Sequence, residues 1–218
     1  MNNRSSKQYP LDWDYTPSHS LEDYLLSSSN ELAYAAIKDQ KSWASHALCI
    51  YGPASSGKTH LAYSFSELTS SFHVKGNEEL SDIEAHNSFV VEDVDQNIYD
   101  EHLLFHLFNW SKENGGYLLL TARSAPSKWN FELPDLKSRI GLMDVKEIAE
   151  PDDDLLEKIY YKLFSDRQIS IDPSLIKFLL VHVERSFEAA ENIVVRLDQE
   201  ALSKKCKVSR QLAASLLK

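Results

Sequence analysis

The residues best suited to chemistry form one glycine-rich segment that fits the phosphate-binding pattern G-x-x-x-x-G-K-[ST]: Gly52, Pro53, Ala54, Ser55, Ser56, Gly57, Lys58 and Thr59. Its glycines allow several backbone N–H groups to point at an anion. Lys58 can reach the outer phosphates of a nucleotide, and the Thr59 hydroxyl can ligate Mg²⁺. A chance match on a Gly/Ser-rich turn is the alternative, but an apolar segment precedes the motif and a helical segment follows it, as phosphate binding requires. The segment therefore predicts a site for ADP or ATP with Mg²⁺.

A pair of acidic residues could complete that site. Glu92 and Asp93 directly follow the apolar segment Phe89-Val90-Val91. We expect Glu92 to bind Mg²⁺, directly or through water, and Asp93 to orient or deprotonate an attacking water. The usual order places an aspartate first, and a longer glutamate there would hold the metal more loosely. The alternative is an acidic strand end that only caps a loop.

Thr121 is a third candidate, because it ends the apolar run Leu118-Leu119-Leu120 with a hydroxyl. In many ATPases with this type of loop, the equivalent position senses the γ-phosphate. A threonine that only closes a strand explains the pattern almost as well.

The surrounding pattern predicts the elements that position these residues. Apolar strands are expected at 47–51, 72–75, 89–91, 117–120 and 145–148. A helix whose apolar residues include Leu32, Ala33, Ala36 and Ile37 is expected before the first strand, and further helices after the loop motif and over 100–114. Strands alternating with helices indicate an α/β fold with a parallel sheet. After Pro151 only helices are expected, beginning near 152, 173, 186 and 209. We therefore predict a flexible arm over 1–20, an α/β nucleotide-binding core over 21–150 and a small all-α lid over 151–218.

Composition limits the possible functions. The chain has 218 residues with 23 Lys+Arg and 33 Asp+Glu, a formal net charge of −10, and all of that excess lies in residues 1–150. This acidity argues against a protein that grips nucleic acid over a broad surface. No apolar run is long enough for a membrane span, no secretory signal is visible, and two cysteines exclude a disulfide scaffold, so we expect a cytoplasmic protein. The stretch 76–110, which lacks Lys and Arg, is either a solvated acidic face or a surface for a basic partner.

Taken together, the loop, the acidic pair, Thr121 and the trailing helices resemble an AAA+ ATPase, and more closely its DnaA initiator branch. Ser20–Ala33 is similar to the adenine-pocket segment of that branch, which assigns Tyr24 and Leu25 to nucleotide binding. Asp135–Arg139 is similar to its box VII, in which the arginine is an arginine finger, so the resemblance implies that Arg139 acts on a nucleotide held by another subunit.

Within that branch, the chain looks like the Hda family of DnaA-homologous regulators, especially its short alphaproteobacterial form. The expected lid reaches the end of the given sequence, so we expect a form that lacks the DNA-binding domain of DnaA, and Glu184–Glu191 looks like that short form. Hda-type proteins carry a sliding-clamp-binding motif near the N-terminus. The candidate is Gln8, Tyr9, Pro10 and Leu11, an extended peptide whose Gln would bond the pocket rim while Leu11 fills an apolar pocket. A flexible tail with an incidental Gln and Leu is the alternative.

One family position departs from the pattern. In the DnaA branch the sensor 2 arginine opens the last long lid helix, but here Phe187 takes that position and Arg185 lies two residues earlier. Arg185 could reach the nucleotide from the preceding turn, or be an exposed structural arginine. With the leading Glu92, this makes us expect weak hydrolysis of the chain's own ATP and an ADP-bound state that is competent to act.

The resemblance implies a bacterial, replisome-associated negative regulator of replication initiation. Bound to the DNA polymerase III β sliding clamp, it would stimulate hydrolysis of DnaA-bound ATP through Arg139, reaching DNA only indirectly, with a homo-oligomer possible and no membrane partner. A surface ion pair of Arg139 with Asp135 or Glu132 is the structural alternative. Two other functions stay open: an autonomous AAA+ ATPase similar to a helicase loader, and a non-catalytic adaptor stabilised by nucleotide.

Overall fold

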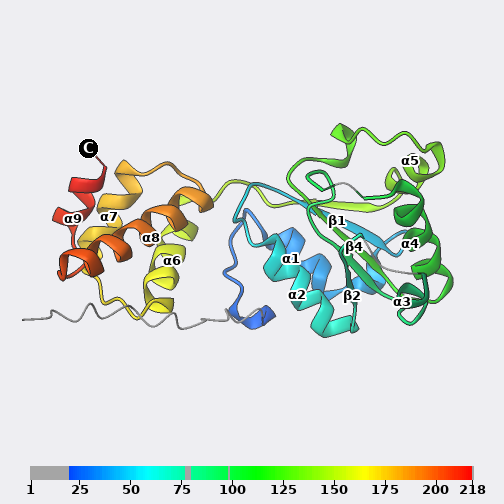
Figure 1. Cartoon of the computed structure of the whole chain (residues 1–218), viewed down its shortest axis with the longest axis horizontal. Coiled ribbons are helices and arrows are strands. Elements are labelled where there is room, and N and C mark those ends of the chain that lie inside the picture. Colours follow the sequence, from blue (N-terminus) through cyan, green and yellow to red (C-terminus); the bar gives the residue numbers. More distant parts are fainter. Residues whose placement is uncertain (1–19, 77–79, 98, 218) are drawn as a thin grey trace, which may run out of the picture.

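The computed structural model describes residues 20–76, 80–97 and 99–217 of the chain (Figure 1). A five-stranded sheet with helices on both faces occupies one end of the molecule, and a group of four helices occupies the other. The candidate clamp-binding residues Gln8–Leu11 lie outside the described residues.

The sheet confirms the expected α/β class. Its strands are ordered β2-β3-β4-β1-β5, and every pairing is parallel. Their bounds are β1 Ala47–Tyr51, β2 Phe72–Val74, β3 Phe89–Val91, β4 Leu118–Ala122 and β5 Asp144–Glu147. Parallel strands present their carboxyl ends at one edge, so the residues that follow β1, β3 and β4 are brought together there.

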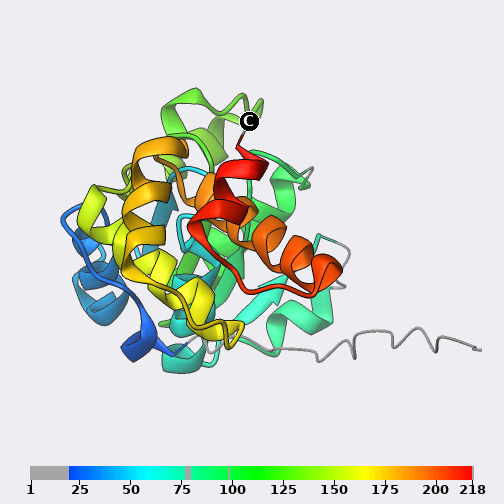
Figure 2. The ribbon, with the colours of Figure 1, turned by 90° about the vertical axis from the view of Figure 1, so that its left-hand side faces the viewer.

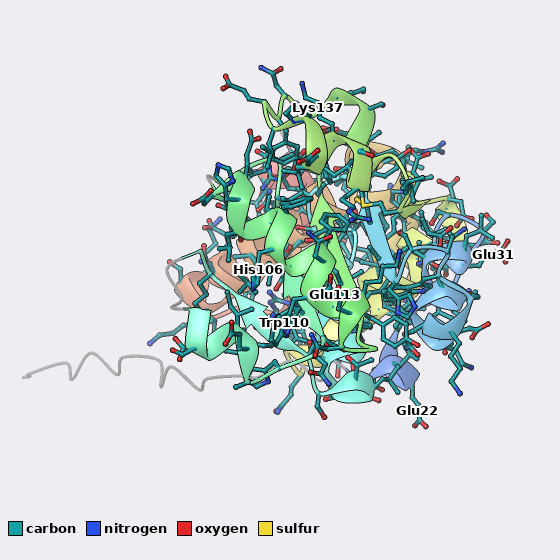
Figure 3. All side chains as sticks on the ribbon, turned by 90° about the vertical axis from the view of Figure 1, so that its right-hand side faces the viewer. Glu22, Glu31, His106, Trp110, Glu113 and Lys137 are labelled. Atoms are coloured by element: carbon teal, nitrogen blue, oxygen red, sulfur yellow. The ribbon has the colours of Figure 1, made fainter. Side chains whose placement is uncertain are left out.

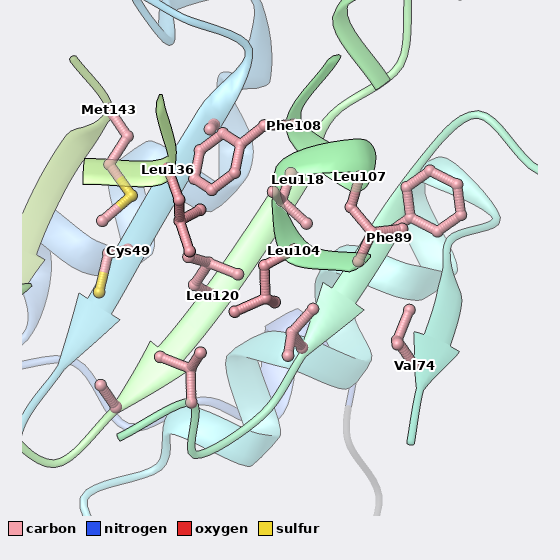
Figure 4. Close-up of a cluster of buried hydrophobic side chains, with 14 of the residues drawn as sticks. Cys49, Val74, Phe89, Leu104, Leu107, Phe108, Leu118, Leu120, Leu136 and Met143 are labelled. Atoms are coloured by element: carbon pink, nitrogen blue, oxygen red, sulfur yellow. The ribbon is translucent and has the colours of Figure 1, made fainter. Parts of the chain in front are cut away.

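Helices cover both faces of the sheet, and alternate strand residues explain how. Leu48 and Ile50 pack toward α1 and α2, whereas Cys49 packs toward α4 and α5. Figure 4 shows this second layer, with Leu104 of α4 and Leu136 of α5 beside Leu120 and Cys49 of the strands. The helices are α1 Glu31–Lys38, α2 Lys58–Thr69, α3 Leu80–Glu84, α4 Glu101–Glu113 and α5 Pro134–Ile140, with short 3₁₀ turns at Leu21–Asp23, Gln40–Ser42 and Pro126–Lys128.

The C-terminal helices form a separate small core, which we call the helical lid: α6 Asp153–Asp166, α7 Pro173–His182, α8 Phe187–Lys204 and α9 Arg210–Leu216 (Figure 2). Asp152, Asp172, Ser186 and Ser209 each accept a hydrogen bond from a backbone N–H of the first turn that follows, which is why the helices begin where the sequence predicts. Tyr160, Phe164 and Leu197 are fully buried at the centre of this lid.

Two local features go beyond what the sequence pattern predicted. Leu32 is 65% exposed, because α1 packs through Ala33, Ala36 and Ile37, and Leu32 points away from that stripe. The short helix α3 has no counterpart among the predicted elements. Within the described residues, no helix has the length and apolar character needed to cross a bilayer.

Candidate functional site

The glycine-rich loop joins β1 to α2, and its two glycines are required by close contacts. A Cβ on Gly52 would lie 2.5 Å from the carbonyl oxygen of Ile148. Gly57 has φ +88°, and a Cβ there would lie 2.9 Å from the ring of Tyr24. The backbone can therefore take this path only without side chains at both positions.

Lys58 lies inside the loop. Its Nζ donates hydrogen bonds to the carbonyl oxygens of Gly52, at 2.9 Å, and Pro53, at 2.6 Å, and the side chain is buried. Burial lowers the pKa of Lys58, an effect that the nearby carboxylate of Asp93 opposes. The ammonium is thus fixed beside the backbone N–H groups expected to face a phosphate.

The expected magnesium ligands meet at the carboxyl end of the sheet. The Thr59 hydroxyl donates to Oε2 of Glu92 at 2.7 Å, although the two residues are 33 positions apart. A hydroxyl and a carboxylate are the hard oxygen ligands that Mg²⁺ takes up beside nucleotide phosphates, so these residues fit the ion. Within the described residues, no cluster of three or more His, Cys, Asp and Glu side chains suggests another metal site.

Asp93 and Thr121 are held to each other through the backbone. Asp93 has φ +49°, and its N–H donates to Oγ1 of Thr121 at 3.0 Å. Thr121 is only 1% exposed, so its hydroxyl ties the end of β4 to the turn after β3. This bond agrees with the structural interpretation of Thr121, and a role for it in sensing phosphate stays a prediction.

A second cation near the loop escaped the sequence analysis. The charge of Arg123, which follows β4, helps to lower the pKa of Lys58, and the backbone N–H groups of Arg123 and Ser124 donate to the carboxylate of Asp95 at 2.9 and 2.8 Å. Burial of Asp95 acts against its charged form, but these hydrogen bonds and one from the Ser124 hydroxyl prevail and lower its pKa. In the sequence, Arg123 could have been noticed only as an arginine two residues after Thr121, because it belongs to neither the loop motif nor the acidic pair.

A pocket of about 200 Å³ lies between the loop and the lid. From the core it is lined by Tyr24, Leu25, Asn30, Ser55, Ser56, Gly57 and His60, and from the lid by Leu155, Ile159, Lys162, Leu163, Asp166, Phe187 and Glu191. The structure thus brings Tyr24 and Leu25 to the loop, as expected. The Tyr24 ring stacks on Tyr34 with centroids 5.9 Å apart and meets His60 edge-on, and burial raises the pKa of its phenol.

Hydrogen bonds between described residues join the lid to the core around this pocket. Ser55 of the loop donates to Glu191 of α8 at 2.9 Å, and Lys162 of α6 donates to the carbonyl of Asp23 at 3.1 Å. The Ser28 hydroxyl donates to Asp152 at 3.3 Å. Because Ser55 is itself a loop residue, the lid and the phosphate-binding segment are directly connected.

The structure does not bring Arg185 to the pocket. Its guanidinium lies 3.0 Å from Asp153, both side chains are more than half exposed, and they border a different surface hollow. Phe187 lines the pocket in its place. The reason is that α8 begins at Phe187, which leaves Arg185 on the outer side of the turn before the helix.

Arg139 is positioned by α5, far along the chain from the loop. Figure 3 shows Lys137 of the same helix at the top of the face that α4 covers, with Glu22 and Glu31 toward the opposite face. Within the described part of the chain, the Arg139 guanidinium forms no ion pair, including with Asp135 or Glu132. The segment just before α5 is instead held by Glu101, whose carboxylate accepts hydrogen bonds from the backbone N–H groups of Glu132 and Leu133 at 2.6–3.0 Å.

No protein-family model matches the chain. The chromosomal replication initiator DnaA of Campylobacter jejuni subsp. jejuni serotype O:6 is 24% identical over 233 residues, which cover 93% of this chain and 52% of that protein. An uncharacterized protein of Haemophilus influenzae is 25% identical, with 90% of this chain and 92% of that protein covered. The chain spans about half the length of the Campylobacter DnaA that it matches.

Solved structures agree on the fold. Domain III of Thermotoga maritima DnaA superposes with a TM-score of 0.77 at 19% identity, covering 93% of this chain and 96% of that one. AMPPCP-bound DnaA of Aquifex aeolicus gives 0.69 at 19% identity, covering 88% and 69%. The chain therefore has the AAA+ P-loop fold of DnaA domain III, followed by helices, and its sequence is similar to that of DnaA.

Proposed function

We propose that this chain is a nucleotide-binding AAA+ regulator that stimulates hydrolysis of ATP bound to DnaA while attached to the sliding clamp, and so limits replication initiation. The relation to DnaA supports an assembly in which this chain contacts a DnaA protomer as AAA+ subunits contact one another. Clamp attachment is assigned to Gln8, Tyr9, Pro10 and Leu11, which places the protein on DNA through the clamp.

The observation that carries the proposal is the guanidinium of Arg139, which has no intramolecular ion pair among the described residues and is only partly buried. Inserted beside ATP on a DnaA protomer, it would stabilise charge on the transferring phosphoryl group. An arginine supplied in trans raises hydrolysis by on the order of 10³–10⁵-fold.

The chain's own nucleotide would have a structural role. Lys58 would bind its phosphates, Thr59 and Glu92 would hold Mg²⁺, and Tyr24, Leu25 and Phe187 would enclose the base. When bound, the ion neutralises phosphate charge. Because Ser55 bonds to Glu191, a change in the loop is transmitted to α8, and the bound nucleotide would thus set the position of the lid.

The test measures ATP hydrolysis by this protein alone, by DnaA alone, and by the mixture with and without DNA-loaded clamp. We expect acceleration only in the full mixture, and its loss in Arg139→Ala. Lys137→Ala, on the same helix, is the matched control and should retain most of the acceleration. Acceleration that is unchanged by Arg139→Ala would remove Arg139 from the mechanism.

Autonomous hydrolysis is the second candidate, because Thr59, Glu92 and Asp93 come together at one edge of the sheet. It would give turnover by this protein alone, with neither DnaA nor clamp, and Asp93→Asn would abolish it. Turnover absent from the isolated protein would rule it out.

A further inference from the structure

We propose that His73 is a positioning residue that braces the carboxylate of Glu92, the magnesium ligand assigned above. The inference rests on magnesium–nucleotide binding at this loop but not on any action on DnaA. It concerns the leading glutamate, whose additional length leaves the carboxylate freer than an aspartate would be.

The two oxygens of Glu92 face two different partners. Oε2 accepts the 2.7 Å hydrogen bond from Thr59, and Oε1 lies 3.5 Å from Nδ1 of His73. The two side chains of this second contact are equally shielded, each 27% exposed. The carboxylate is therefore held from the loop side and from the opposite side, which fixes the direction in which Oε2 points.

His73 is itself held in one orientation. Its ring stacks on Tyr63 with centroids 4.8 Å apart, and Nε2 lies 2.7 Å from Oγ of Ser66. The Ser66 hydroxyl lies within hydrogen-bonding distance of both the carbonyl of Ala62 and Nε2 of His73. When its single hydrogen is donated to Nε2, the neutral imidazole carries its own hydrogen on Nδ1 and directs it toward Glu92. With Nε2 committed to α2, Nδ1 is the nitrogen that faces Glu92.

The sheet explains why this contact exists. His73 lies on the edge strand β2, where it pairs in register with Val90, two residues before Glu92. The Tyr99 hydroxyl also donates to the backbone carbonyl of Glu92 at 3.0 Å, so the backbone at this position is fixed as well. A glutamate there reaches across to β2, where a shorter aspartate would fall short of the imidazole. His73 thereby offsets the looseness that a leading glutamate introduces.

The experiment uses the full chain and a fluorescent ADP analogue, titrated with Mg²⁺ and, separately, in EDTA. His73→Phe keeps a ring to stack on Tyr63 and removes both nitrogens. We expect the Mg²⁺ concentration for half-maximal enhancement of nucleotide binding to rise about 10-fold, as for other partners that orient a metal ligand, with affinity in EDTA unchanged. His86→Phe is the matched control: His86 also stacks on an aromatic ring, Phe72, but its ring has no contact with Glu92.

A double-mutant cycle separates bracing from a general structural effect. In a Glu92→Asp background the His73→Phe change should have no further effect on the Mg²⁺ dependence, because the shorter side chain no longer reaches β2. Equal effects in both backgrounds, or a His73→Phe midpoint matching wild type, would overturn the proposal. If His73→Phe does not fold, His73→Gln takes its place. Its half-maximal Mg²⁺ concentration is expected to lie between that of wild type and the roughly 10-fold higher value expected for His73→Phe.

Failure of this inference is distinguishable from failure of the proposed function. A wild-type protein that shows no Mg²⁺-dependent nucleotide binding would contradict both. A wild type that binds normally, with an unshifted His73→Phe variant, would contradict only the role of His73.

Discussion

The hydroxyl of Thr59, in the first turn of α2, donates a 2.7 Å hydrogen bond to the carboxylate of Glu92, directly after β3. This bond joins two segments that the sequence analysis could only place at the same edge of a parallel sheet. Because Glu92 reaches Thr59, its side chain is long enough to share an ion with the loop, and replacing either partner should affect magnesium more than nucleotide.

Thr59→Val removes the hydroxyl and keeps the side-chain shape. We expect the enhancement of nucleotide affinity by Mg²⁺ to be reduced about 10-fold or more, while binding in EDTA stays near wild type, since the hydroxyl is a ligand of the ion. Thr69→Val is the control at the far end of α2, where the hydroxyl donates to the carbonyl of Phe65 and lies against the hydroxyl of Ser71. Equal losses in the two variants would contradict the assignment.

Gly57→Ala should be considerably more harmful than Gly115→Ala. Both glycines have positive φ, but a Cβ at Gly57 would lie 2.9 Å from the Tyr24 ring, whereas at Gly115 nothing lies within 4 Å. We expect Gly115→Ala to lower the free energy of unfolding by about 1 kcal/mol, the usual range for a left-handed alanine. Gly57→Ala should lower it further and abolish nucleotide binding, as measured by urea unfolding and calorimetric titration. Similar values for both variants would show that the Tyr24 contact is unimportant.

Glu101→Gln should impair the action of Arg139 without touching the nucleotide site. The hydrogen bonds from the N–H groups of Glu132 and then Leu133 lower the pKa of Glu101 and fix the segment that leads into α5. We expect stimulation of DnaA–ATP hydrolysis to fall about 10-fold, because a displaced catalytic group loses rate steeply. Glu113→Gln, at the other end of α4, should behave as wild type. Reduced nucleotide binding in Glu101→Gln would point to a wider structural effect.

Asp95→Asn gives a pH-dependent test of the strand-end network. The pKa of Asp95 is lowered in the folded state, so its carboxylate stabilises the protein above its unfolded pKa, and that stability is lost as pH falls through the folded pKa. We expect the variant to be less stable by about 1–2 kcal/mol at pH 7, and the difference to shrink below about pH 4. Urea unfolding of both proteins at about pH 7 and at steps from about pH 4 down to about pH 2 measures this. A difference that does not change with pH would mean that the charge is not involved.

The sequence was a good guide wherever a local signal determines the outcome. The loop motif, the acids after β3 and the four lid caps are all short patterns whose physics acts within a few residues. Asp152 and Ser186, for example, cap α6 and α8 through hydrogen bonds to N–H groups three positions on. The order of the strands along the chain likewise implied a parallel sheet, because each connection contains a helix.

What the sequence could not supply depends on packing between distant segments. Phe187, Leu155 and His60 line one pocket only because the lid lies against the loop, and no spacing encodes that. The contact between His73 and Glu92 requires the register of β2 on β3. Arg185 shows the reverse: its nearness in sequence to the sensor 2 position suggested a role, but the turn before α8 directs it to Asp153.

The pocket is built from residues near 24–60 and residues 155–191, so neither part can form it alone. During synthesis from the N-terminus, the sheet core can therefore be complete before a ligand in this pocket has both walls to contact. A ligand bound there would stabilise only chains that have already been extended through α8 and folded there, by mass action. In a cell with abundant ligand, only complete and folded chains would then be protected from proteolysis by the ligand. Truncated or half-folded molecules would gain no such protection.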